Sequence, residues 1–290
     1  MTINAVANGS GVGFTQGANA ISSLAGGVTI TANSQTGIAY SSTGNITALG
    51  QAITIAGTST TAASISDTGT ISGGAVTLIG TQSTSTATAT PITATGAITA
   101  NSLTVTGAGG ASTTIVSLGA ITINAGGGNI TVTANNAAAG TNTGITQTGA
   151  INDNAVGSNI SFISNNDINQ TGTITLVGNT GTAPANIIFN TIAGNNTSTI
   201  TTAALSVTGT STSAINYLVK TNGAIISVPA ITVPGYILLD DSCLGCGTAI
   251  TTSTAAANGA AITITGALSA GSLAGSTGVT INAVANGTGV

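Results

Sequence analysis

The sequence predicts an all-β fold, a parallel β-solenoid in the form of a right-handed β-helix with about twelve coils. Three observations predict this fold. Short segments that alternate apolar and hydroxyl residues recur along the chain, they recur every 22 to 25 residues in its first half, and the chain begins and ends with nearly the same eleven residues. Such a chain extends by stacking similar units and does not close around one core.

Each expected strand is a segment in which every second residue is apolar and the residues between are mostly Thr or Ser. Strict alternation is typical of a strand with one buried face, and the β-branched Ile, Val and Thr favour strands. Gly, Asn and Ser cluster between the segments, where they favour turns. In chain order the expected strands are Gly27–Asn33, Ala52–Gly57, Ala75–Gly80, Ala97–Asn101, Ala120–Gly126, Asn129–Asn135, Asn159–Asn165, Ala261–Gly266 and Val279–Ala283.

The spacing of these strands predicts the coils. Steps of 25, 23, 22 and 23 residues separate Val28, Ile53, Val76, Ile98 and Ile121. One coil of two or three short strands has this length. Later, Ile121 and Ile130 are only nine residues apart, as expected when two faces of one coil carry the same strand motif. An antiparallel sandwich is the rival fold, but it favours two-residue hairpins and larger core residues.

The end of the chain repeats its beginning. Thr2–Val12 reads TINAVANGSGV and Thr280–Val290 reads TINAVANGTGV, 278 residues later. A repeat of this length, itself made of smaller similar units, indicates a segment of a longer tandem array. We expect a solenoid rod at residues 1–211, an irregular coil or protruding loop at 212–250, and rod again at 251–290, where the repeat restarts at residue 280.

Three phrases, Gly27–Asn33, Gly119–Gly126 and Gly127–Asn135, resemble the rod repeats of filamentous-haemagglutinin-type, two-partner-secreted adhesins and related giant bacterial β-strand-repeat proteins. The resemblance covers most of the chain. It implies a right-handed parallel β-helix in an extracellular or cell-surface rod, and it transfers no binding residue. The chain departs from that family in its near absence of charge, and it carries no secretion-domain motif.

Composition excludes several classes of protein. Charged residues make up 2% of the chain, against roughly a quarter in an ordinary soluble domain. Disorder is excluded because 41% of the residues are hydrophobic and the Ile and Val are periodic. A net charge of -4 offers no basic surface for nucleic acid. The longest apolar stretch, Ala224–Leu239, is short and contains two prolines, so we expect no membrane insertion.

Catalysis has few residues to use. The chain has no His, Glu or Arg, one Lys and five Asp, and general acid–base or nucleophilic catalysis needs such groups in clusters. We therefore expect no enzyme and no cofactor. The two candidate calcium ligands are Asp153 and Asp167, each beside Asn residues. The alternative is that these side chains form turns at coil corners.

The segment 212–250 differs in composition from the rest. It contains the only Lys, two of three Tyr, two of four Pro and both Cys. An irregular element on a uniform rod is where a partner-specific loop is expected, although the segment could equally be a coil that packs on itself. We expect Cys243 and Cys246 to form a local disulfide in an oxidising setting. The candidate partner-binding residues are Tyr217, Lys220, Tyr236, Asp240 and Asp241.

These observations predict a non-enzymatic structural rod of a large secreted or surface-anchored bacterial protein that serves adhesion or a biofilm matrix. The expected partners are a host or surface receptor and further copies of the chain. One alternative is an extracellular fibre whose subunits stack head to tail. Another is ice binding, since pairs such as Thr29 and Thr31 place two hydroxyls on one face. The uneven spacing of these pairs argues against the flat register that ice requires and favours solvated outer faces.

Overall fold

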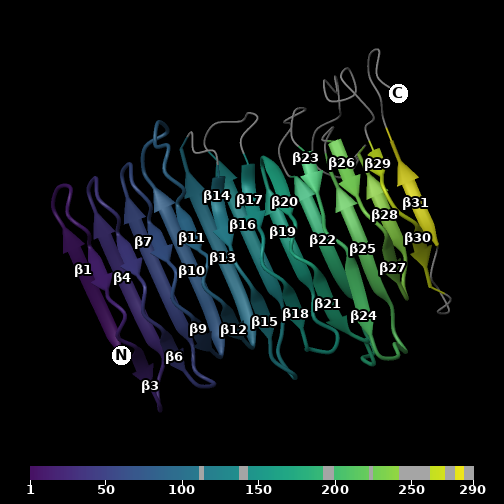
Figure 1. Cartoon of the computed structure of the whole chain (residues 1–290), viewed down its shortest axis with the longest axis horizontal. Coiled ribbons are helices and arrows are strands. Elements are labelled where there is room, and N and C mark those ends of the chain that lie inside the picture. The colour runs from purple at the N-terminus through teal and green to yellow at the C-terminus, as the bar shows by residue number, and fades with distance from the viewer. Residues whose placement is uncertain are drawn as a thin grey trace.

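The computed structural model describes residues 1–110, 114–136, 143–191, 199–221, 225–241, 262–271 and 278–283. These residues form a parallel β-solenoid, as the sequence predicted (Figure 1). Each coil contributes one strand to each of three sheets, which we name faces A, B and C in chain order. Strands of one face pair only with strands of the coils before and after, so the first and last coils lie at opposite ends of the rod.

Face A has the longest strands, of up to eight residues. Its strands are β1 (Thr2–Ala7), β4 (Val28–Ser34), β7 (Ile53–Ser59), β10 (Ala75–Gln82), β13 (Ser102–Gly109), β16 (Ile130–Asn136), β19 (Ile160–Ser164), β22 (Ala185–Thr191), β25 (Ile215–Lys220), β28 (Ile237–Asp240) and β31 (Val279–Asn282).

Face B consists of strands of three to five residues. They are β2 (Phe14–Gln16), β5 (Tyr40–Ser42), β8 (Ile65–Asp67), β11 (Ile92–Ala94), β14 (Thr114–Leu118), β17 (Thr143–Gln147), β20 (Asp167–Gln170), β23 (Thr199–Thr201), β26 (Ile225–Val228) and β29 (Ile262–Ile264).

Face C consists of eight short strands, and two further strands continue the third position of the coil as a separate sheet. The eight are β3 (Ile21–Ser23), β6 (Ile46–Ala48), β9 (Ile71–Gly73), β12 (Ile98–Ala100), β15 (Ile121–Ile123), β18 (Ile151–Asp153), β21 (Ile174–Val177) and β24 (Leu205–Thr208). The other two are β27 (Ile231–Val233) and β30 (Leu268–Ala270).

The described residues therefore contain fewer coils than the twelve expected. Eight coils have all three sheets continuous, two more follow, and β31 begins another. The expected number was wrong because the spacing mixed two faces: Val76 lies on face A, whereas Ile98 lies on face C. Residues that pair on face A are 20 apart at Tyr217 and Ile237 but 42 apart at Ile237 and Val279.

Length varies at two corners of the coil and hardly at the third. Between a face B strand and the next face C strand the chain has two to four residues throughout. Between face A and face B it has from two residues, after β19, to 21, after β28. Glycine explains the constant corner: a Cβ added to Gly96 or Gly172 would collide with the carbonyl oxygen of the glycine one coil earlier. The backbones of adjacent coils touch at this corner, so it has no room for a side chain and little room for extra residues.

Inward side chains form continuous apolar columns. On face A, Ile30 pairs in register with Ile55, which pairs with Leu78, and all three are fully buried. Ile130 is likewise buried while its neighbour Thr131 is half-exposed, as the alternation predicted. Each buried Ile or Leu stabilises the fold by about 1.5–3 kcal/mol relative to exposure. The columns thus hold every coil to its neighbours.

Aromatic rings lie inside the rod in the later coils. Phe162 and Phe189 occupy paired positions of β19 and β22 and stack with centroids 5.3 Å apart and planes inclined by 5°. The ring of Tyr217 continues the group at 5.8 Å from Phe189, tilted by 53°. Offset and tilted arrangements of this kind stabilise aromatic pairs beyond their buried area. The interior is therefore wide enough to hold rings stacked along the rod axis.

Candidate functional site

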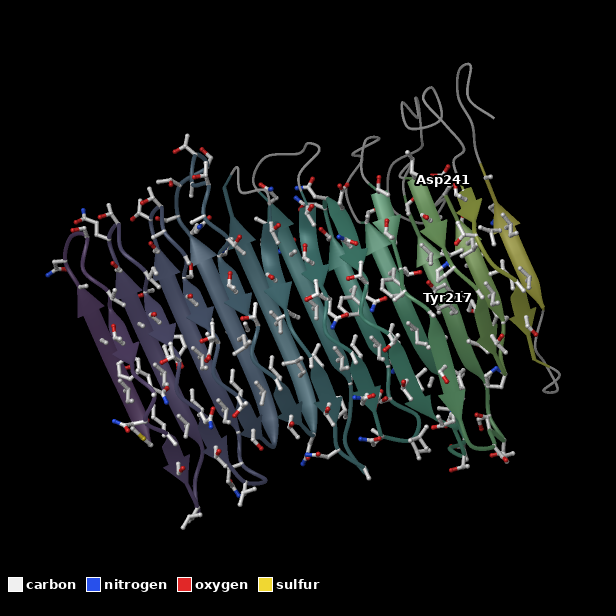
Figure 2. The ribbon with its side chains drawn as sticks, viewed as in Figure 1. Tyr217 and Asp241 are labelled. Carbon is white, nitrogen blue, oxygen red and sulfur yellow. The ribbon has the colours of Figure 1, made fainter. Side chains whose placement is uncertain are left out.

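The structure places the five residues of the expected partner-binding loop in or directly beside regular strands. Tyr217 belongs to β25, is fully buried, and donates a hydrogen bond from its hydroxyl to Thr202 Oγ1 at 2.6 Å. Asp241 follows β28, is also buried, and accepts a hydrogen bond from Thr221 Oγ1 at 3.1 Å. Figure 2 shows both residues in the later coils. Neither side chain is available to a partner.

The remaining three candidates lie closer to the surface. Lys220 and Asp240 are paired positions of β25 and β28, both half-exposed, so opposite charges occupy adjacent coils of face A. Tyr236 is half-buried, and its backbone N–H donates to Asn216 Oδ1 at 3.2 Å. Cys243 and Cys246, with the rest of 242–250, lie outside the described residues.

Residues 215–240 contain four strands of the solenoid, so this part of 212–250 continues the rod, in coils of unequal length. The reason is local. Pro229 and Pro234 flank β27 and do not interrupt it, in positions where a missing N–H does not break a strand. Tyr217 substitutes for the aliphatic residue of its inward column, opposite Ile187 and Ile237. The unusual composition of this segment therefore reflects a change in the side chains that fill the core.

The outer surfaces carry hydroxyl groups in register, and they are the principal functional candidate. On face A six consecutive coils place threonine in one row: Thr2, Thr29, Thr54, Thr77, Thr104 and Thr131. All six are exposed or half-exposed. Consecutive members of the row are separated by one strand spacing, about 4.8 Å.

A second outward row lies beside the first because the strands of face A are long. It contains Asn4, Thr31, Ala56, Ile79, Thr106 and Thr133. Ala56 and Ile79 interrupt the threonines of this second row, so pairs such as Thr29 and Thr31 do not recur in every coil. The first row keeps its threonines in register because the extra residues lie at the corners and the paired strands remain aligned.

Faces B and C each carry one outward row that continues from coil to coil through the described strands. Every member of these rows is a hydroxyl or amide residue in the described coils. The face B row is Thr15, Ser41, Ser66, Thr93, Ser117, Thr146, Asn169, Thr201, Ser227 and Thr263. The face C row is Ser22, Thr47, Ser72, Thr99, Thr122, Asn152, Thr175 and Ser206.

A polar cluster lies inside the first three coils. Asp67 is buried, and its carboxylate accepts hydrogen bonds from Gly69 N at 2.8 Å and from the Tyr40 hydroxyl at 3.2 Å. Burial raises the pKa of Asp67 to about 6, although both hydrogen bonds oppose this. Gln16 and Ser42 complete the cluster, with Ser42 Oγ donating to Gln16 Oε1 at 3.2 Å. Burial and the nearby Asp67 carboxylate raise the pKa of Tyr40 above its usual value.

The two calcium candidates are engaged by the protein itself. Asp153 faces the interior from β18, where its carboxylate accepts hydrogen bonds from Ala155 N at 3.0 Å and from the Ser158 hydroxyl. Asp167 accepts one from Thr199 N at 2.7 Å. Burial raises the pKa of Asp153, and it raises that of Asp167 to about 6. In the described ranges no three Asp, Glu, His or Cys side chains gather as metal ligands.

An asparagine ladder at the corner between faces C and A was missed from the sequence. Asn129 Oδ1 accepts from Asn159 N, and Asn159 Oδ1 accepts from Asn186 N, each at 2.8 Å. Asn216 Nδ2 then donates to Asn186 Oδ1 at 3.0 Å. The detectable signal was Asn immediately before the inward apolar residue at 129, 159, 186 and 216. Its hydrogen bonds join four consecutive coils.

One cavity of about 410 Å³ lies where the sheet of face C ends. Strand β24 pairs with β21 but not with β27, and the hollow between β24 and β27 is lined by residues such as Leu205, Val207, Thr232 and Pro234. Among the described residues, those that line it are neither charged nor aromatic.

Comparisons with known proteins found no relative of this chain. No protein-family model matches the chain, and neither curated proteins nor solved structures give a match. In the part of the chain that the structure describes, no helix has the length and hydropathy to cross a membrane.

Proposed function

We propose that the chain is a non-enzymatic rod segment of a large secreted or surface-anchored bacterial protein, serving adhesion or a biofilm matrix. The observation that supports this proposal most is the continuous parallel ladder of faces A and B, which spans the described coils from β1 to β31 and from β2 to β29. A solenoid in which each coil contacts only its neighbours is extended by nature, and its function is commonly to span distance or present surface.

The tandem repeat supports the same proposal. Thr2 pairs with Thr29 and Thr280 pairs with Leu238, all in the same outward row of face A. Equivalent residues 278 positions apart therefore lie on the same face, with their side chains pointing outward. At about 4.8 Å per coil, ten coils give a rise of about 48 Å for one unit. Tandem units then continue one rod without a joint.

A protein made of two tandem units tests the rod. Two units joined at residue 279 are expected to give a single straight particle by electron microscopy and small-angle X-ray scattering, longer than the single chain by about 48 Å. Two bodies at variable angles would contradict the proposal. An antibody raised against the chain tests the location separately: it should label intact source cells or their matrix, and labelling only after lysis would contradict a surface role.

Ice binding is a second candidate, favoured by the six-coil threonine row on face A. Thr has a stiff χ1 angle, and the fully buried Ile53, Ile55 and Leu78 hold the strands from beneath. The first seven strands of this face contain no charged residue, whereas Lys220 and Asp240 occur only later. A neutral, repeating array of hydroxyls and methyls suits a ligand that is itself periodic.

Thermal hysteresis measured with purified protein tests ice binding. We expect hysteresis to be lost in a Thr54→Lys, Thr104→Lys double variant and retained in the matched face B variant Thr93→Lys, Thr146→Lys. Circular dichroism checks that both variants keep the fold. Absence of hysteresis in the parent chain, or equal loss in both variants, would exclude this function.

A further inference from the structure

We propose that Lys220 and Asn190 become joined by an amide bond between Lys220 Nζ and Asn190 Cγ. The bond forms within the folded rod, with Asp240 as the group that transfers the proton. It ties two consecutive coils together through their side chains. The proposal goes beyond the rod function, because a solenoid needs no covalent bond between its coils, and it does not depend on where the rod is located.

The three residues occupy one outward row of face A in three consecutive coils. Asn190 of β22 pairs with Lys220 of β25, and Lys220 pairs with Asp240 of β28. Paired residues of neighbouring strands lie about 4.8 Å apart, with their side chains on the same side of the sheet. The four-carbon chain of Lys220 spans that distance. Its amine can therefore reach the side-chain carbonyl carbon of Asn190, while Asp240 flanks it in the next coil.

Asn190 has a buried side-chain oxygen without a hydrogen-bond partner. Its Oδ1 accepts no hydrogen bond in the part of the chain that the structure describes. Such an oxygen is uncommon in native proteins, because it has lost its water and gained no bond in return. By contrast, Asn186 of the same strand donates to Asn159 Oδ1 and accepts from Asn216 Nδ2. The oxygen of the Asn190 carboxamide is thus shielded from water and has no structural role among these residues.

The outward side of these coils is more apolar than the same side earlier in the rod. The row beside the three residues contains Ile188, Leu218 and Leu238, where earlier coils carry threonine. Leu218 is only 5% exposed although it points outward. Water therefore has little access to this part of the surface, which favours attack on the amide by an amine over hydrolysis.

The reaction balances without any added reagent. The amine of Lys220, in its neutral form, attacks Cγ of Asn190, and the Nζ–Cγ bond forms. The Asp240 carboxylate accepts a proton from the attacking nitrogen and returns it to Nδ2 of Asn190. The Cγ–Nδ2 bond then breaks, and Nδ2 leaves as ammonia. One amide replaces another, so no oxidant, reductant or activated co-substrate is consumed.

The bond lies at the joint where the complete described coils share the fewest ladders. The coil that contains β22 is joined to the next coil on faces A and B, through β22–β25 and β23–β26. On face C, β24 and β27 do not pair, and the cavity of about 410 Å³ lies between them. Every earlier pair of coils is joined on all three faces. A covalent link between β22 and β25 therefore reinforces the joint that lacks a ladder.

Trypsin provides a direct test, because Lys220 is the only Lys or Arg of the chain. Trypsin cleaves after a lysine with a free amine and not after one whose amine is acylated. The full chain, prepared without a tag, is incubated in the folded state, then reduced, denatured and digested. We expect one uncleaved chain, lighter than the sequence by one ammonia. Tandem mass spectrometry after elastase digestion should then identify a branched peptide that contains Asn190 and Lys220.

Variants of the full chain assign the roles, and circular dichroism checks that each keeps the fold. Asn190→Ala lacks the acyl group and Asp240→Ala lacks the proton acceptor, so both are expected to keep the full mass and to give two tryptic fragments. Asp240→Glu restores a carboxylate and is expected to recover part of the resistance to trypsin. Asn169→Ala removes an outward asparagine from face B. It is the matched control and should resist trypsin like the parent chain.

A resistant parent chain that becomes cleavable in Asn190→Ala supports the bond. Complete cleavage of the parent chain at full mass would overturn the proposal without reference to any variant. Loss of one water in place of ammonia would move the bond to Asp240 and overturn the assignment of Asn190. Loss of ammonia from a chain that trypsin still cleaves would indicate a succinimide at an asparagine, and would also overturn it. Rod length by small-angle scattering on the same samples tests the rod proposal separately.

Discussion

The hydroxyl of Tyr40 lies 3.2 Å from Asp67 Oδ2 inside the rod, across paired strands of adjacent coils. Both side chains are fully buried or nearly so. The hydroxyl donates and the carboxylate accepts, so the pair is stabilised as an anion bonded to a neutral phenol. Asp67 nevertheless has a pKa of about 6 because burial penalises its charge.

We predict that the rod is more stable at mildly acidic pH than at neutral pH. The folded pKa of Asp67 and of Asp167 is about 6, above the ordinary value of 3.8. Between these values the folded state binds more protons than the unfolded state, so stability falls as pH rises from about 4 to 6 and stays lower above. The melting temperature measured from pH 4 to 8 by circular dichroism should decline over this window.

Asp67→Asn is the matched control for that profile. The amide is neutral at every pH and similar in shape, so it removes one titrating group. We expect the variant to gain about 1–2 kcal/mol relative to the parent chain at pH 8 and to show a shallower profile. A rise in parent stability between pH 4 and 6 would contradict the prediction.

The inward column is predicted to be far more sensitive than the outward row beside it. Ile130→Asp places a carboxylate among aliphatic residues with no cation near, and should cost about 4 kcal/mol or more. Thr131→Ser, one residue away on the outside, should change stability by less than about 0.5 kcal/mol. Ile123→Asp and Thr122→Ser repeat the comparison on face C. Urea unfolding compares the four variants, and similar losses at both kinds of position would refute the assignment.

The asparagine ladder is predicted to stabilise the middle coils. Asn159→Ala removes the acceptor of Asn186 N and leaves that donor without this partner, at a cost of about 1–3 kcal/mol. Asn152→Ala removes an outward, exposed Asn from β18 and is the control. Chemical denaturation measures both. Equal free energies of unfolding for the two variants would show that the ladder adds nothing.

Cys243 and Cys246 are predicted to be joined by a disulfide. They are the only cysteines of the chain, and two residues separate them. Intact mass after alkylation, with and without prior reduction, distinguishes the bonded form from two thiols. Two alkylated cysteines in unreduced protein prepared under oxidising conditions would show the prediction to be wrong.

Alternation predicted the inward and outward residues because it is a local property. Ile130 and Thr131 were assigned correctly from seven residues of sequence. The face to which a strand belongs is not local, since it depends on which corner precedes it. Ile98 continued the spacing of Val76 by coincidence and belongs to another face. Register was therefore missed, and with it the threonine row of face A.

The candidate binding residues depended on a different kind of signal. Rare residue types in 212–250 predicted an irregular coil or a protruding loop, and one of them, Tyr217, fills a core position that Ile fills elsewhere. The chain has only three tyrosines. A rare residue type of this kind can mark a core position of different volume as readily as a binding residue. Asn216 was not singled out because Asn is also a turn former. Only the paired strands reveal that it bonds along the rod.

The tight glycine corner also determines where foreign sequence can be carried. Because the corner between faces B and C is closed by touching backbones, peptides inserted there would separate the coils. The corner between faces A and B already accommodates between two and 21 residues with the ladders intact. Peptides grafted at that corner in successive coils would emerge along one edge at intervals of about 4.8 Å. The rod is thus a linear display scaffold, with a permissive edge on one side and an edge closed by glycine on another.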